Sequence, residues 1–190
     1  MSKIAIVYFS GYGHTAKVAE EVRQGASTGG AEVSMHRINA EGELSEADWA
    51  ALNTADTIVY GSPTYMGGPA WQFKKFADAS AKPWFGGAWN EKLAAGFTNS
   101  ASTNGDKFST MSYFWTLSQQ HGQLWAGTGL LPANSKASTN ADVNWTAGFG
   151  GLMTISPSDA SVDESPAAGD LKTARLFGER LAQLTARWVR

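Results

Sequence analysis

Residues 4–15 read IAIVYFSGYGHT, an apolar run followed at once by a glycine-rich turn. The run from Ile4 to Phe9 is rich in β-branched and aromatic residues, which is typical of a strand buried on both faces of a parallel sheet. Beyond the turn, apolar residues recur at helical spacing from Ala16 to Ala26, and the pair Gly29-Gly30 ends the pattern. A strand, a glycine-rich turn and an amphipathic helix together predict the opening of a βαβ unit.

The alternation of strands and helices continues along the chain. Further strands are expected at residues 32–37, 56–61, 93–98 and 123–126, and helices at about 45–52, 71–83, 107–120 and 170–190. The stretch 127–169 is rich in Gly, Ser, Asn, Thr and Pro, and only residues 149–155 within it resemble a strand. It therefore predicts a loop excursion around the fifth strand. The whole chain, residues 1–190, is predicted to form one α/β domain, a doubly wound sheet of five parallel strands with helices on both faces.

The composition limits the classes of function. Hydrophobic residues make up 43% of the 190 residues and charged residues 17%, which is typical of a globular protein. A net charge of -2 gives no basic surface for a nucleic acid, so none is expected as a partner. The chain has no cysteine, so any redox chemistry must come from a bound cofactor. No stretch approaches the ~20 apolar residues of a membrane span, and we expect a cytoplasmic protein without an integral membrane segment.

Three polar loops each follow a predicted strand, at residues 10–15, 62–69 and 99–105. Ligands of open parallel sheets bind at the carboxyl ends of the strands, so these loops are expected to meet at one ligand. The first loop offers backbone N–H groups freed by glycines, the hydroxyls of Ser10 and Thr15, and the positive end of a helix, all of which suit a phosphate. Taken alone, the motif is also compatible with a glycine turn that only reverses the chain.

The first loop also fits the dinucleotide-binding pattern G-x-G-x-x-A through residues 11–16. That pattern is normally followed by an acidic residue ~20 positions later, whereas here the second strand ends in His36-Arg37. The hydroxyl-bearing loop and a chain of five strands instead favour a mononucleotide. No metal site is predicted, because no carboxylate accompanies His14 or His36 at ligand spacing.

Five motifs extend this pattern along nearly the whole chain: SGYGHT at residues 10–15, GSPTYMG at 61–67, KLAAGF at 92–97, WTL at 115–117 and HG at 121–122. In this order and spacing they resemble the flavodoxin-like NAD(P)H:quinone oxidoreductases of the WrbA type. The resemblance implies a flavodoxin-like sheet with strand order 2-1-3-4-5 and non-covalently bound FMN. It also implies an FMN-dependent NAD(P)H dehydrogenase (quinone) that passes electron pairs from NADH or NADPH to quinones by a ping-pong hydride mechanism.

The resemblance implies a role for each matching residue. The ribityl phosphate would be held by Ser10, Gly11, Tyr12, Gly13, His14 and Thr15. The isoalloxazine ring would be lined by Pro63, Thr64, Tyr65, Met66 and Gly67. The pyrimidine edge of the ring would meet the backbone N–H groups of Asn99, Ser100, Ala101, Ser102, Thr103, Asn104 and Gly105. The substrate would contact Tyr12 and Trp84, and His121 would be catalytic, beside the flavin where quinone or nicotinamide stacks.

His121 and the tryptophans leave alternatives open. His121 follows a predicted helix, so it is either a C-terminal cap or a hydrogen-bond donor to a quinone oxygen. Among the eight tryptophans, those at helical apolar positions are expected in the core: Trp71, Trp115 and Trp188. Trp84 and Trp89 flank a glycine pair and are expected to line a flat aromatic pocket.

Two functions are compatible with such a site. In the first, the chain is the enzyme described above, acts on small planar acceptors such as quinones, and forms a homo-oligomer, a dimer or tetramer. In the second, it is a flavodoxin-type one-electron carrier that docks on protein partners and has no NAD(P)H-dependent activity. Carriers of that kind use dense acidic surfaces for steering, so the net charge of -2 favours the enzyme.

Overall fold

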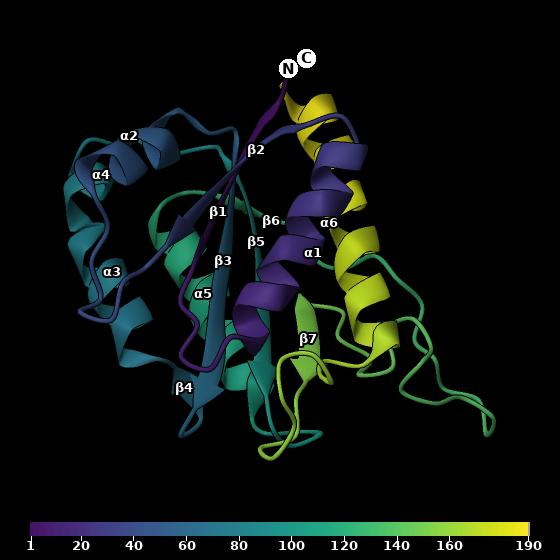
Figure 1. The fold of residues 1–190 in the computed structure, drawn as a ribbon. Coiled ribbons are helices and arrows are strands. Elements are labelled where there is room, and N and C mark those ends of the chain that lie inside the picture. The colour runs from purple at the N-terminus through teal and green to yellow at the C-terminus, as the bar shows by residue number, and fades with distance from the viewer. Residues whose placement is uncertain (190) are drawn as a thin grey trace.

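β1 (Lys3–Tyr8) is an inner strand of the sheet, and every residue after Lys3 is buried, because a strand covered by helices on both faces of the sheet must be apolar on both faces. The computed structural model describes residues 1–189. Its other elements are α1 (His14–Thr28), β2 (Glu32–Arg37), α2 (Glu46–Thr54), β3 (Thr57–Tyr65), β4 (Gly68–Pro69), α3 (Trp71–Ala79), α4 (Ala81–Phe85), β5 (Leu93–Ser100), α5 (Lys107–Gln120), β6 (Leu124–Trp125), β7 (Leu152–Ile155) and α6 (Ala168–Trp188). Helices cover both faces of the sheet (Figure 1).

The main path of the sheet follows the order β2-β1-β3-β5-β6, and each pair along it is parallel. This is the 2-1-3-4-5 order of a flavodoxin-like α/β fold. β2 lies at an edge of the sheet and is less buried than the inner strands. The carboxyl ends of β1, β3 and β5 therefore meet at one edge of the sheet, where the three polar loops begin.

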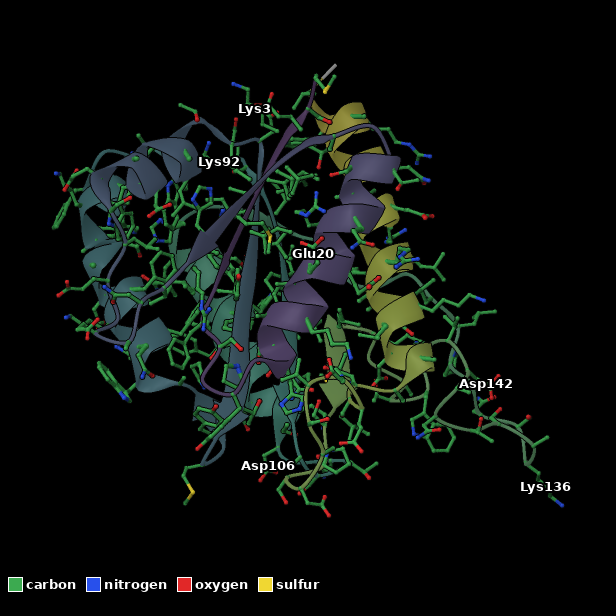
Figure 2. All side chains as sticks on the ribbon, viewed as in Figure 1. Lys3, Glu20, Lys92, Asp106, Lys136 and Asp142 are labelled. Carbon is green, nitrogen blue, oxygen red and sulfur yellow. The ribbon has the colours of Figure 1, made fainter. Side chains whose placement is uncertain are left out.

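The prediction of five strands is wrong in number, because the fifth strand is split. β6 pairs with the start of β5 through Leu93 and Leu124, whereas β7 pairs with its end through Phe97 and Leu152. Residues 126–151 separate the two halves and extend away from the sheet toward Lys136 (Figure 2). In addition, β4 forms a short antiparallel hairpin with the end of β3.

The two faces of the sheet build two core layers. Ile4 and Ile6 of β1 pack with residues of α1 and α6, whereas Ala5 and Val7 pack with residues of α2, α3 and α5. Successive side chains of a strand point to opposite faces, so one apolar run supplies both layers. Together the layers explain why the central strands contain so few polar residues.

The tryptophans do not follow the prediction. Trp89 is fully buried and stacks with Phe76, whereas Trp71 and Trp115 are 61% and 50% exposed. Trp188 is also about half exposed, at 46%. Helical spacing locates the side of a helix that faces the core, but a large indole at the margin of that side lies along the surface and keeps one edge in water.

α1 and α6 approach each other closely through two glycines. A Cβ atom on Gly25 would lie 1.9 Å from the carbonyl oxygen of Arg175, and one on Gly178 would lie 2.1 Å from that of Val22. Only a hydrogen in place of a side chain permits this backbone contact. α6 is the longest helix, with 21 residues, yet no helix within residues 1–189 is long and apolar enough to cross a membrane.

Gly25→Ala is expected to destabilise the fold by about 1–3 kcal/mol, because the methyl group must push α1 and α6 apart. Gly86→Ala is the matched control, since its new Cβ would meet nothing closer than the Pro83 carbonyl oxygen at 3.8 Å. Urea unfolding followed by circular dichroism measures both variants. Equal midpoints for G25A and G86A would contradict the close helix contact.

Candidate functional site

A cavity of about 590 Å³ opens at the carboxyl ends of four strands. Its walls come from the segment after each strand: Tyr12, His14 and Thr15 after β1; Pro63, Thr64 and Tyr65 at the end of β3; Asn99, Ser100 and Ala101 at the end of β5; and Ser156, Pro157, Ser158, Ala160, Ser161 and Val162 after β7. In Figure 2 Asp106, in the loop after β5, marks this edge, and Lys92 marks the opposite one. The volume lies within the range of small-ligand sites.

The loop after β1 folds around the hydroxyl of Ser10. This buried oxygen accepts the backbone N–H groups of Gly13 and Ala16, each at 3.2 Å. Gly13, the residue just before α1, has a φ of 96°, which favours glycine. Helical geometry gives the N–H groups of His14 and Thr15 no intrahelical acceptor, so the first turn of α1 offers donors at one end of the cavity.

Two glycines let the first loop approach its neighbours. A Cβ atom on Gly11 would lie 2.7 Å from the hydroxyl oxygen of Tyr65, and one on Gly13 would lie 2.7 Å from Cγ2 of Val162. The loop is therefore packed between the end of β3 and the segment after β7. Both glycines serve this packing as well as the turn itself.

The second loop is a hairpin whose tip turns away from the cavity. Tyr65 pairs with Gly68, and Met66 and Gly67 between them have φ angles of 46° and 78°. Positive φ at both central positions is typical of a type I′ turn. Met66 is fully exposed at this tip, and neither Met66 nor Gly67 lines the cavity, although the resemblance implied that both line the ring.

The hairpin is anchored to the sheet by buried hydroxyls. Thr64 Oγ1 lies 2.8 Å from that of Thr98 on β5 and 2.7 Å from that of Thr110 on α5. Ser62 Oγ accepts the backbone N–H of Ala70 at 2.9 Å. These bonds hold the end of β3 beside the end of β5 beneath the cavity.

The third loop divides between the cavity and its surroundings. Asn99 Oδ1 accepts the hydroxyls of Thr154 at 2.8 Å and Ser156 at 3.0 Å, which ties β5 to β7. Thr103 lines a neighbouring cavity of about 360 Å³, as does Asp170. The rest of the loop, Ser102, Asn104 and Gly105, is absent from the walls of the larger cavity, although the resemblance implied a flavin contact for each of them.

A buried cation and a buried carboxylate lie behind the third loop. Lys107 and Asp170 are only 2% and 3% exposed. Burial lowers the pKa of Lys107 to about 8, against the attraction of Asp170. Burial raises the pKa of Asp170 to about 6, against the N–H of Ile155, which donates to its Oδ2 at 2.8 Å, and the attraction of Lys107.

His121 and Trp84 lie together at the opposite edge of the sheet from the cavity. His121 Nε2 lies 2.9 Å from Ser80 Oγ, and Trp84 Nε1 donates to the carbonyl of Gln120 at 2.7 Å. The N–H of Glu91, next to Lys92, donates to the carbonyl of Gly122, which fixes this end of α5 at the amino ends of the strands. The resemblance implied that His121 lies beside the flavin and that Trp84 contacts the substrate. Within one chain neither residue lines the cavity, because α5 carries its C-terminus away from it. Burial also lowers the pKa of His121 to about 4. His121 is the residue that ends α5.

Sequence reasoning missed the segment 156–162. Lys17 of α1 holds it, because its Nζ donates to the carbonyls of Val162 at 2.5 Å and Asp163 at 3.2 Å. The sequence did contain a signal for this segment, because residues 149–155 resemble a strand and the segment after a parallel strand emerges at the same edge as the other loops. The segment was not assigned to the site because it follows a long polar excursion.

The residues around the cavity fit FMN. His14 lines the cavity, and within residues 1–189 its buried Nε2 has no hydrogen-bond partner. The buried Thr15 and the first turn of α1 supply donors suited to a phosphate, and Tyr12 and Tyr65 place aromatic rings 6.2 Å apart at the mouth. The fold and site thus define the class of flavodoxin-like proteins that bind FMN at the carboxyl ends of a parallel sheet.

Comparison with known proteins identifies the family. The flavodoxin domain matches residues 5–121, and the chain belongs to this flavodoxin family. It is 47% identical over 184 residues to "Flavodoxin FldP" of Pseudomonas aeruginosa (strain UCBPP-PA14), covering 97% of each chain. It also matches the crystal structure of "the flavodoxin, WrbA-like protein from Agrobacterium tumefaciens", with 46% identity, 98% of this chain and 99% of that chain covered, and a TM-score of 0.79. An archaeal flavodoxin structure, 16% identical over 97% of this chain and 99% of that one with a TM-score of 0.66, shares the fold.

Asp170→Asn is expected to stabilise the protein increasingly as the pH rises from about 4 to about 7. The pKa of this carboxyl is about 6 in the fold and about 4 when unfolded, so the wild-type chain loses stability as Asp170 ionises. The wild-type protein loses about 2–3 kcal/mol of unfolding free energy in this way, whereas the variant with asparagine, which does not ionise, loses none of it. Urea unfolding at a series of pH values measures the difference, with Asp142→Asn on the exposed excursion as the control for a lost charge. Parallel pH profiles for D170N and the wild type would contradict the buried ionisation.

Proposed function

We propose that the chain is an electron carrier of the flavodoxin type that binds FMN in the 590 Å³ cavity. The observation that carries the proposal is the convergence of four strand ends on a cavity with unpaired donors at one end and aromatic rings at its mouth. The family supports FMN as the cofactor. FMN supplies the redox chemistry, since it accepts electrons singly or in pairs.

Different residues of the chain bind different parts of FMN. Ser10 fixes the shape of the first loop by accepting two backbone N–H groups at its hydroxyl oxygen. Thr15 and the first turn of α1 donate to the phosphate. Tyr12 and Tyr65 flank the ring at the mouth, while Pro63, Asn99 and Ala101 also line the cavity. Tyr12 is 79% exposed, so the ring edge beside it is accessible to a partner protein.

Two observations favour a carrier over an NAD(P)H:quinone oxidoreductase. The residues that the enzyme needed beside the flavin, His121 and Trp84, lie at the opposite edge of the sheet. The relative that is 47% identical along almost the whole chain is named a flavodoxin. Quinone reduction with NADH or NADPH remains the second candidate, because the similar Agrobacterium tumefaciens structure is described as WrbA-like.

Thr15→Val is expected to weaken FMN binding about tenfold or more, because the buried hydroxyl that donates to the phosphate is lost at constant shape. Riboflavin has no phosphate, so its affinity should change little. Quenching of flavin fluorescence measures both dissociation constants. The control is Thr116→Val on α5, whose hydroxyl donates only to the carbonyl of Ser112. An equal loss of affinity for FMN and riboflavin in T15V would contradict the proposed hydrogen bond from Thr15 to the phosphate.

Loading the protein with FMN and adding NADH or NADPH anaerobically separates the two functions. A carrier should leave the oxidised flavin absorbance unchanged with either nucleotide, while titration with dithionite reduces the flavin in two separate one-electron steps. Stopped-flow absorbance follows the first reaction and equilibrium spectra follow the second. Fast bleaching by a nucleotide, reversed by benzoquinone, would establish the reductase and overturn the carrier.

A further inference from the structure

A buried ammonium group lies inside the loop between β5 and α5. Lys107 is the first residue of α5, and its side chain turns back into the preceding loop, where it is 2% exposed. Its Nζ donates to Ser100 Oγ at 2.8 Å and to the carbonyl of Ser102 at 2.6 Å. Lysine is rarely buried so completely, because desolvation of the charge must be offset by such bonds.

The loop is folded tightly around these groups. Ser100 Oγ itself donates to the carbonyl of Ser102 at 3.2 Å. A Cβ atom on Gly105 would lie 2.3 Å from the same Oγ, so the loop closes directly onto Ser100. Asp106, just before Lys107, adopts a φ of 52°, which directs the chain from the loop into α5. Residues 100–105 therefore take their shape from Lys107 and Ser100.

The ammonium lies directly behind the wall of the FMN cavity. Ser100, whose hydroxyl oxygen accepts a hydrogen bond from this ammonium group, lines that cavity together with Asn99 and Ala101. On the other side Asp170, at the start of α6, attracts Lys107 and accepts the N–H of Ile155 on β7. Lys107 is thus linked electrostatically, through Asp170, to the start of α6 and the end of β7.

We propose that Lys107 is a positioning residue that fixes the loop of residues 100–105, so that its cavity-lining residues Ser100 and Ala101 lie against the ring of bound FMN, and that it places a positive charge behind them. The inference rests on the proposed function. The isoalloxazine ring of FMN is neutral when oxidised and would carry one negative charge after gaining two electrons and one proton, which a nearby desolvated cation favours. Lys107 therefore raises the reduction potential of the bound flavin and also fixes the loop.

The test compares Lys107→Gln, which keeps a hydrogen-bond donor without the charge, with Ser100→Ala, which keeps the charge without the acceptor. Lys92→Gln is the matched control: Lys92 Nζ donates to the carbonyls of Asn53 and Ala55 at the opposite edge of the sheet. Flavin fluorescence gives the FMN dissociation constants, and dye-linked equilibration gives the potentials. Amide hydrogen exchange of the apoprotein reports on residues 100–105.

K107Q should weaken FMN binding and make exchange faster in residues 100–105. Its two-electron potential should fall by about 30 mV, which corresponds to an about tenfold weaker preference for the reduced flavin. S100A should loosen the loop in the same way but leave the potential near that of the wild type. K92Q should leave FMN binding, the exchange of residues 100–105 and the potential unchanged.

A K107Q protein that binds FMN with an unchanged potential and unchanged loop exchange would overturn the inference alone. If K107Q does not fold, S100A decides: faster loop exchange with weaker FMN binding supports the inference, and no change in either overturns it. Failure of the wild-type chain to bind FMN would overturn the proposed function and this inference together. The two failures are thus distinguished by the wild-type titration.

Discussion

The parallel alignment of β1, β3, β5 and β7 is the constraint on which the site depends. Parallel strands joined by crossovers deliver every strand end to the same edge of the sheet, whatever the lengths of the connections. The register then sets Pro63 beside Asn99 on one side and Thr154 beside Asn99 on the other. Asn99 accepts the hydroxyls of Thr154 and Ser156, so polar groups at this edge satisfy one another and fix the cavity wall without a ligand.

The cationic side chains around the cavity follow a single pattern: each donates hydrogen bonds to backbone carbonyl groups. Lys17 donates to carbonyls of residues 162 and 163, Arg37 donates to the carbonyl of Ser10, and Lys107 donates to that of Ser102. The first loop therefore offers a phosphate N–H groups and hydroxyls rather than a lysine side chain. Helix N-termini suffice for phosphate binding, so an overall charge of -2 is compatible with an anionic cofactor.

The sequence predicts the parts of the fold that depend on local pattern. The buried run at Ile4–Phe9, the helix at 107–120 and the three polar loops all follow from periodicity and glycine placement, and the structure brings those loops to one edge. The direction in which α5 leaves that edge is a tertiary property. A histidine at the end of a helix and one at its start look alike in sequence, but here the helix carries His121 to the far edge and keeps Lys107 beside the site.

The split fifth strand explains why the segment 156–162 escaped prediction and why the site tolerates the excursion. β6 and β7 pair with different halves of β5, so residues 126–151 leave the sheet between them without shifting the register of either half. β7 then returns the chain to the edge where β1 and β3 end, and Val162 reaches Gly13 from there. Because pairing with β5 fixes β7, the fourth wall of the cavity is set by the sheet, while the excursion extends away from it (Figure 2). A chain can therefore carry a long insertion inside a strand and still present a continuous binding edge.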